Sequence, residues 1–224
     1  MGLGESIESL ITARRRRRLS RLIGPLGDFF RAGGNPHLLQ GLLLREDEIA
    51  IDVGGFRGDW TAEILCRFGC RTFTLEPVPA FQADLRKRFG SNSRVTLIDA
   101  GLGATTGQVM MTLAGDGSSA FGAGADAAST FSAPIVGVAE LWRDRKLGQV
   151  GCMKINIEGG EYDLLEAMLD GGLSDQVSVF LIQFHQNVPG YESRRDAIRE
   201  RLARSHRNDL DYPFVWERWV RHRS

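Results

Sequence analysis

The sequence has no long apolar run, only three cysteines and no net charge. No apolar run approaches the ~20 residues that a membrane-spanning helix needs, so we expect a soluble protein. The run Arg14–Arg18 follows the apolar residues of the N-terminus, whereas a signal peptide has these regions in the opposite order. Cys66, Cys70 and Cys152 cannot all pair with one another, and we interpret them as packing residues. Together these features predict a protein of the reducing cytoplasm.

A positive field over the whole molecule is also absent. Lys and Arg total 28 and Asp and Glu total 28, so the formal net charge is zero and we expect no nucleic-acid partner. The run Arg14–Arg18 is a local exception, which lies on a solvated helix face or contacts an anionic glycolipid or a peripheral membrane surface. The sequence points to no particular oligomeric state.

The composition is typical of a globular protein, with 42% hydrophobic and 25% charged residues. A chain of 224 residues suits one α/β domain with a substantial core. From Glu48 onward, short β-like runs alternate with amphipathic stretches, which predicts βαβ units and a mostly parallel sheet. We expect strands near residues 49–53, 71–76, 94–99, 107–113, 152–157 and 177–184, and helices near residues 58–68, 79–89, 159–169 and 191–204.

The two ends of the chain differ from this pattern. Residues 1–45 contain helical stretches broken at Gly24-Pro25 and at "AGGNP", which predicts an N-terminal helical cap on a domain of residues 46–224. At the C-terminus, "DYPFVWERWVRH" alternates large apolar and charged residues. This alternation predicts an antiparallel strand that closes the edge of the sheet.

The stretch "IAIDVGGFRGDW" places a carboxylate at the mouth of a glycine-rich turn. Asp52, Gly54 and Gly58 fit the pattern D-x-G-x-x-x-G, whereas the dinucleotide pattern needs a glycine where this chain has Val53. The carboxylate would also oppose a pyrophosphate bound at the helix amides. The turn therefore favours a cationic ligand, which the backbone at Gly54, Gly55 and Gly58 can approach closely. The alternative is a tight turn whose glycines only allow helix packing.

Two further carboxylates follow the next strands. Glu76, 24 residues after Asp52, ends "TFTLEP", where an acid can accept hydrogen bonds from both ribose hydroxyls of an adenosine. Asp99 ends "TLIDAG" and is the predicted contact to the adenine edge. A ligand with ribose, adenine, an ammonium group and a sulfonium fits these positions. We therefore predict S-adenosylmethionine as the cofactor, with Asp52 holding its cationic methionine end through water or the neighbouring amides.

Two motifs carry a resemblance to a known family. "IDVGGFRGD" is similar to the "DVGxNxG" turn of the FkbM-type methyltransferases, and "MKINIEGGEYDLLEAM" is similar to their "KIDxEGxExxxL" motif. The resemblance covers roughly residues 40–220. It implies a Rossmann-like class I methyltransferase fold and O-methyl transfer, often to a sugar or polyketide hydroxyl. Two positions depart from the pattern, because Phe56 replaces the usual Asn and Asn156 replaces the usual Asp.

The predicted catalytic residues follow the fourth and fifth strands. Glu158, at the end of "KINIE", is expected to face the acceptor, and Lys154 on the same strand is expected to neutralise a buried carboxylate. His185, in "FLIQFHQN", is the predicted general base, with Glu158 orienting it or the acceptor. A purely structural role is the alternative for His185, and Glu161 is a candidate helix cap.

The segment "GDGSSAF", residues 115–121, belongs to a long loop rich in Gly, Ala and Ser. It either folds over the cofactor, with Ser118 or Ser119 donating hydrogen bonds, or is a flexible linker. We find no clear cluster of Asp residues at the fourth and fifth strand ends, so we expect no metal ion.

These observations predict an S-adenosylmethionine-dependent O-methyltransferase. Its acceptor is expected to be a small molecule or glycan, with the methyl group going to a hydroxyl of a sugar, glycolipid or related natural product. A catalytically silent module that binds adenosine, S-adenosylmethionine or a partner is the alternative, which Phe56 and Asn156 keep open. A nicotinamide-dependent oxidoreductase is disfavoured by Asp52 and Val53.

Overall fold

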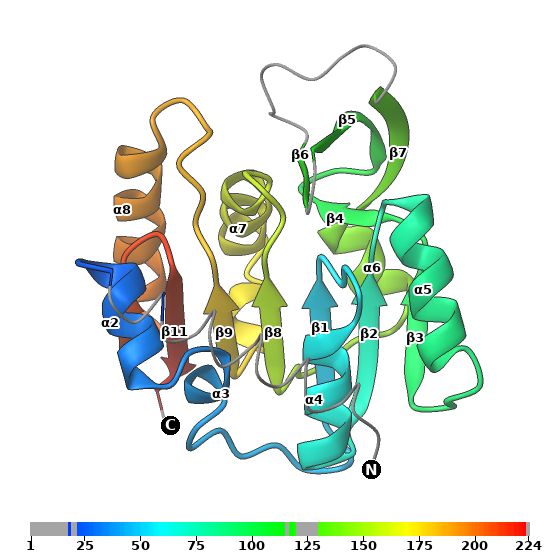
Figure 1. Ribbon diagram of the computed structural model, residues 1–224, viewed down its shortest axis with the longest axis horizontal. Helices are drawn as coiled ribbons and strands as arrows, with labels where there is room; N and C mark the ends of the chain where they lie inside the picture. The colour runs from blue at the N-terminus through cyan, green and yellow to red at the C-terminus, as the bar shows by residue number, and fades with distance from the viewer. Residues whose placement is uncertain (1–17, 19–21, 115–116, 120–129, 223–224) are drawn as a thin grey trace.

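A computed structural model describes residues 18, 22–114, 117–119 and 130–222 of the chain (Figure 1). Within these residues the main sheet has the strand order β10-β11-β9-β8-β1-β2-β3. The strands are β1 (Ile49–Val53), β2 (Arg71–Leu75), β3 (Val95–Ile98), β8 (Cys152–Ile155), β9 (Val179–Ile182), β10 (His206–Tyr212) and β11 (Trp216–Arg221). The predicted α/β class with a mostly parallel sheet is confirmed.

The strand order reverses on either side of β1. This strand pairs in parallel with β2 on one side and with β8 on the other, although β8 lies about 100 residues further along the chain. Connections that leave β1 in opposite directions open a crevice at the carboxyl ends of these strands. The fold therefore brings the end of β1 together with the ends of β2 and β8.

Helices cover both faces of the main sheet. Along β1, Ile51 and Val53 join a core cluster that includes Tyr162, whereas Ala50, directly before Ile51, joins the cluster of Ile64 on the opposite face. The helices of the domain are α4 (Asp59–Phe68), α5 (Pro79–Phe89), α6 (Val138–Asp144), α7 (Glu161–Asp170), the short 3₁₀ helix η2 (Ser174–Gln176) and α8 (Tyr191–Leu202). None of the described helices has the length and apolar character needed to cross a membrane.

A second, smaller sheet was not predicted beyond its one strand near residues 107–113. Its strands have the order β4-β7-β5-β6, with β4 (Gly101–Gly103), β5 (Gly107–Ala114), β6 (Gly117–Ser119) and β7 (Thr130–Gly137). Figure 1 shows this sheet beyond the carboxyl ends of β1 and β2. It is built from the Gly- and Ala-rich segment, in which apolar and polar residues do not alternate clearly.

The position of the C-terminal strand differs from the prediction. β11 is antiparallel, as expected, but it lies between β9 and β10, so β10 and not β11 forms the edge of the sheet. Because β11 is covered on both sides, Glu217 and Trp219 are buried within it. The alternating pattern of this strand indicated its pairing direction but not its neighbours.

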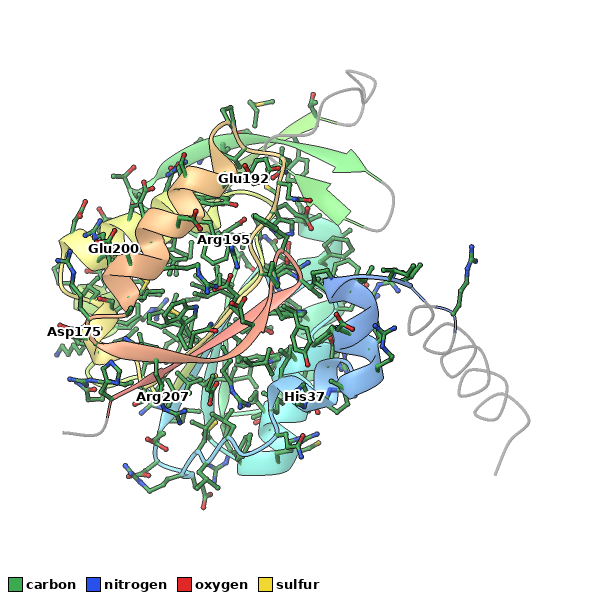
Figure 2. All side chains as sticks on the ribbon, turned by 90° about the vertical axis from the view of Figure 1, so that its left-hand side faces the viewer. His37, Asp175, Glu192, Arg195, Glu200 and Arg207 are labelled. Atoms are coloured by element: carbon green, nitrogen blue, oxygen red, sulfur yellow. The ribbon has the colours of Figure 1, made fainter. Side chains whose placement is uncertain are left out.

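The N-terminal residues that the structure describes contain two short helices, α2 (Pro25–Ala32) and α3 (Asn35–Leu38). Phe29 and Leu38 pack with Leu210 of β10, and Arg218 of β11 donates hydrogen bonds to the carbonyls of Leu38 and Gln40. Figure 2 shows these helices beside the β10–β11 hairpin. Of the run Arg14–Arg18, only Arg18 lies within the described residues, and it is exposed.

Candidate active site

A cavity of about 400 Å³ lies at the carboxyl ends of β1, β2 and β8. Its wall is formed by the glycine turn after β1, the first turns of α4, the residues after β2 and the residues after β8. Asn35 and Leu38 of α3 and Trp216 of β11 also line it. Its size lies within the range of small-ligand sites in proteins, which is roughly 300–1,000 Å³.

Glu76 follows β2 and lines the cavity. Its side chain is 5% exposed, and its two carboxylate oxygens accept hydrogen bonds from the backbone N–H of Phe56 (2.8 Å) and of Val78 (2.9 Å). Burial raises the pKa of Glu76 above its usual value, while these two N–H groups oppose the rise. A carboxylate has about four acceptor positions, so two remain for ligand hydroxyls. Glu76 is therefore held in place with acceptor positions left for a ligand, and its contact with a ribose stays a prediction.

The glycine turn forms the floor of the cavity between β1 and α4. Gly54 has a φ of 85°, and a Cβ atom there would lie 2.1 Å from the carbonyl oxygen of Asn156. Gly55 also lines the cavity, and a Cβ atom there would lie 2.4 Å from Thr74. No other residue fits at these positions. Gly54 thus allows the backbone of the glycine turn to pack closely against the residues after β8.

Gly58 does not line the cavity, and its role as a cofactor-binding residue stays a prediction. It precedes α4 with a φ of 81°, and a Cβ atom there would lie 2.4 Å from Phe89 and 2.8 Å from Leu85 of α5. Its role is to let α4 and α5 pack together. For Gly58, these contacts agree with the alternative interpretation of the turn as a packing device.

Asp52 does not line the cavity either, and its predicted hold on a cationic ligand, through water or the neighbouring amides, stays a prediction. It is completely buried, and its carboxylate accepts hydrogen bonds from Lys154 Nζ (2.9 Å) and from the Thr61 hydroxyl (2.7 Å). Lys154 Nζ also donates to the carbonyl oxygen of Gly54 (2.7 Å) and itself lines the cavity. The neutralising role predicted for Lys154 is confirmed. Asp52 thus forms a buried ion pair with Lys154, which fixes β8 to the glycine turn.

Asp99 was predicted to contact adenine, and this contact stays a prediction. Its side chain is 48% exposed, it pairs with Arg86 of α5, and it does not line the cavity. The carboxylate that was expected to contact adenine forms an ion pair with the guanidinium group of Arg86. Ser118 lies in β6, where its backbone is paired with Leu113 of β5. Most of the remaining loop, including residues 120–129, lies outside the described residues, and the role of Ser118 stays a prediction.

Glu158 lines the cavity and adopts a φ of 55°, a left-handed conformation that is costly for a residue with a side chain. Its Oε1 lies 3.4 Å from His185 Nε2. This hydrogen bond to His185 outweighs the effect of burial and lowers the pKa of Glu158 below its usual value. An ionised carboxylate is therefore presented to the cavity.

His185 lies between two carboxylates. Its Nδ1 is 3.1 Å from Oε1 of Glu161, a completely buried residue whose Oε2 accepts a hydrogen bond from the N–H of Gly159 (2.8 Å). Burial alone would lower the pKa of His185, but the hydrogen bonds to Glu158 and Glu161 raise it to about 9. At neutral pH the imidazole is therefore protonated, and it does not line the cavity. His185 holds Glu158 in place in this structure, and its assignment as the general base stays a prediction.

Two buried polar atoms of the cavity wall lack hydrogen-bond partners among the described residues. They are Oδ1 of Asn156 and Nε1 of Trp60. Buried polar atoms are normally paired, because leaving one without a partner costs about 1–3 kcal/mol. Both residues line the cavity, while these two atoms are themselves shielded from solvent.

No group of three or more His, Cys, Asp or Glu side chains in the described residues is arranged to hold a metal ion. The absence of a metal cofactor stays a prediction. The three cysteines, Cys66, Cys70 and Cys152, are all free.

Comparison with known proteins decides the family. The model of the FkbM methyltransferase domain matches residues 52–212. The chain belongs to this family. The match covers the glycine turn, Glu76 and the residues after β8, so the FkbM-family methyltransferase carries its family motifs at the cavity itself. Its cofactor is S-adenosylmethionine.

Solved structures agree with the fold of this FkbM-family protein. A candidate rRNA methylase from Clostridium thermocellum matches with a TM-score of 0.50 and 11% identity, over 90% of this chain and 99% of that one. A candidate methyltransferase from Streptococcus mutans in complex with S-adenosylhomocysteine matches with a TM-score of 0.49 and 10% identity, over 83% and 94%. A search of curated proteins gave no match. The family match and the structure from Clostridium thermocellum confirm the Rossmann-like class I methyltransferase fold.

The cavity of the FkbM-family methyltransferase fits its cofactor. Glu76 offers carboxylate oxygens to ribose hydroxyls, and the backbone at Gly54 and Gly55 lets a ligand lie close to the turn. The unpaired Oδ1 of Asn156 can accept a hydrogen bond from the ammonium group of the methionine end. An amide oxygen can do this without a charge. The replacement of the usual Asp by Asn156 is therefore compatible with cofactor binding.

Several residues of the FkbM-family site were missed in the sequence. Trp60, Glu63 and Phe81 come from helices that flank the motifs, and Asn35 comes from the N-terminal segment. Phe56 was noted only as a departure from the family pattern, yet it lines the cavity with a φ of 48°. Asn adopts such a conformation more readily than Phe, which accounts for the usual Asn at this position. The spacing of Trp60 and Glu63, three residues apart on one helix face, was the available signal.

Proposed function

We propose that this methyltransferase transfers the methyl group to a hydroxyl oxygen of a small molecule or glycan, such as a sugar, a glycolipid or a related natural product. Carboxylates outnumber cations in the cavity wall, where Asp59, Glu63, Glu76 and Glu158 are accompanied by Arg57 and Lys154. Carboxylates accept hydrogen bonds from hydroxyl groups and repel phosphates. This supports a neutral, hydroxyl-bearing acceptor and argues against nucleic acid as a partner.

Glu158 is the observation that carries the proposal. S-adenosylmethionine supplies a methyl group that is activated by its bond to a positively charged sulfur. Glu158 would accept a hydrogen bond from the acceptor hydroxyl, turn the oxygen lone pair toward the methyl group and take up the hydroxyl proton, while the bond from the methyl carbon to sulfur breaks and S-adenosylhomocysteine leaves. His185 and Glu161 fix the Glu158 carboxylate, since they form one hydrogen-bonded row with it. Alignment of two reactants in this way can supply roughly 7–11 kcal/mol of the reduction of the barrier.

The wall also offers aromatic surface to an acceptor. The rings of Phe56 and Phe81 contact each other edge to face, with centroids 4.4 Å apart, and Trp216 lines the cavity from β11. Aromatic rings bind the apolar faces of sugars and of alicyclic alcohols, while their hydroxyl groups reach polar partners. The combination of carboxylates and rings supports this class of acceptor.

Replacing Glu158 by glutamine tests the proposed function. We expect kcat for methyl transfer to fall roughly 10–100-fold, because a neutral amide cannot accept the proton of the hydroxyl group. The affinity for S-adenosylhomocysteine should change little. The measurement uses isotope-labelled S-adenosylmethionine, a panel of sugars, glycolipids and alicyclic alcohols, and NMR identification of the methylated atom.

Glu200→Gln is the matched control, because Glu200 is exposed on α8, away from the cavity (Figure 2). Methylation of nitrogen or carbon, or an unchanged kcat in Glu158→Gln, would contradict the proposal. Binding of S-adenosylhomocysteine without transfer to any acceptor would favour the silent binding module instead.

The pH dependence of stability tests the charged state of His185. Its pKa of about 9 in the folded protein exceeds the unfolded value of about 6.5, so its stabilising effect is complete below pH 6.5 and is lost as the pH rises through 9. The loss amounts to about 3 kcal/mol. Urea denaturation between pH 6 and pH 10 should show this decline in the wild type and a smaller one in His185→Gln. Identical pH profiles would contradict the assignment.

A further inference from the structure

The ammonium group of Lys154 has one N–H more than it uses inside the described part of the protein. Its Nζ donates to Oδ1 of Asp52 (2.9 Å) and to the carbonyl oxygen of Gly54 (2.7 Å), whereas a lysine ammonium group carries three donors. No residue that the structure describes pairs with the third N–H. The side chain of Lys154 is only 8% exposed, and an unpaired donor at such a depth is costly. The third N–H therefore needs a partner from outside the described residues.

This ammonium group lies at the floor of the cavity. Lys154 lines the cavity, and so does Gly54, whose carbonyl oxygen accepts one of its hydrogen bonds. Among the described residues of the cavity wall, Arg57 is the other cation; it is exposed and contacts the ring of Phe56. Asp52 does not line the cavity. An anionic group of a ligand that lies against the glycine turn therefore meets Lys154 and not its carboxylate partner.

Lys154 and Glu76 lie on opposite sides of β1 (Figure 1). Lys154 belongs to β8 and Glu76 follows β2, and β1 pairs with both strands. These two strands are therefore about 10 Å apart, which is twice the spacing between neighbouring strands. Burial raises the pKa of Glu76, and the positive charge of Lys154 is among the effects that oppose this rise, so the two groups are within electrostatic reach. A cofactor whose ribose lies at Glu76, as predicted, reaches Lys154 by extending across the glycine turn.

We propose that Lys154 binds the carboxylate group of the methionine end of S-adenosylmethionine through the N–H that the protein leaves unpaired. The methionine end extends from the ribose and carries a carboxylate and an ammonium group. A carboxylate oxygen only accepts hydrogen bonds, and a hydrogen bond between a charged donor and a charged acceptor is stronger than one between neutral groups. The inference concerns the cofactor and is independent of the atom that accepts the methyl group.

The test compares the affinities for S-adenosylhomocysteine and for its decarboxylated analogue, which lacks only the carboxylate group. We expect the wild type to bind S-adenosylhomocysteine roughly 10–100-fold more tightly, because a hydrogen bond to a charged group changes affinity by about this factor. In the double variant Asp52→Asn with Lys154→Met, which removes both charges of the buried pair, the two affinities should lie within about threefold of each other.

Arg57→Met is the matched control, because it removes the other cation of the described cavity wall and should keep the preference of the wild type. Equal affinities of the wild type for the two ligands would overturn the inference. So would a preference that persists undiminished in the double variant, or one that disappears in Arg57→Met.

A second measurement uses the wild-type protein and does not depend on the folding of a variant. Lys87 and Lys146 are the other lysines of the chain, and both are exposed. In protein labelled with ¹³C at the lysine side chains, S-adenosylhomocysteine should move the Lys154 resonance further than the decarboxylated analogue does. The resonances of Lys87 and Lys146 should stay in place. A Lys154 resonance that moves equally with both ligands, or with neither, would overturn the inference.

Discussion

Replacing Glu76 by alanine is expected to weaken binding of S-adenosylhomocysteine by roughly 100-fold to 10,000-fold. Two hydrogen bonds from ribose hydroxyls to a charged oxygen contribute about 1.5–3 kcal/mol each, and 1.4 kcal/mol corresponds to tenfold in affinity. The substitution also leaves the N–H groups of Phe56 and Val78 without their carboxylate partner. The free energy of unfolding should therefore fall by about 2–4 kcal/mol.

Isothermal titration calorimetry measures the affinity, and urea denaturation shows that the variant is folded at the temperature used. Glu76→Gln should lie between the wild type and Glu76→Ala, because it keeps one acceptor oxygen. Asp99→Ala is the matched control, since Asp99 is a carboxylate after the neighbouring strand that lies outside the cavity. An equal loss of affinity in Asp99→Ala would restore the predicted adenine contact and contradict the assignment of Glu76.

Lys154→Met is expected to lower the free energy of unfolding by about 3–5 kcal/mol. The side chain of Lys154 is 8% exposed and that of Asp52 is completely buried, so the substitution leaves a buried carboxylate with only the hydroxyl of Thr61 beside it. Removing one partner of a buried ion pair is costly because the remaining charge is uncompensated. The carbonyl of Gly54 also loses its donor, which loosens the glycine turn.

Urea denaturation at pH 7 measures this loss. The double variant Asp52→Asn with Lys154→Met should regain most of the stability, because no buried charge remains. Arg201→Met is the control, since its ion pair with Asp170 is exposed at the surface and should contribute about 0–1 kcal/mol. A loss of less than about 1 kcal/mol in Lys154→Met would show that the pair does not fix β8 to the turn.

Features that depend on local pattern could be predicted from the sequence. β1 has the predicted bounds, α5 runs from Pro79 to Phe89 as predicted, and Glu76 lies at the predicted crevice. Strand ends and helix starts are marked by nearby glycine, proline and changes of periodicity. A carboxylate directly after a parallel strand therefore reaches the crevice at a topological switch point.

Features that depend on distant partners could not be predicted. Asp52 has the same local pattern whether it faces a ligand or Lys154, which is 102 residues away in the sequence. Nothing near His185 in the sequence shows that it lies between Glu158 and Glu161, which reverses its expected charge at neutral pH. The edge position of β10 likewise follows from the packing of the hairpin and not from its own residues.

The central claim is that the cavity at the ends of β1, β2 and β8 holds S-adenosylmethionine for methyl transfer. Calorimetric titration of the purified protein with S-adenosylhomocysteine, beside a titration with NADH, tests it most directly. The account predicts one S-adenosylhomocysteine per chain with micromolar affinity, and no heat of binding with NADH. Binding of NADH, or no binding of S-adenosylhomocysteine at millimolar concentration, would contradict it.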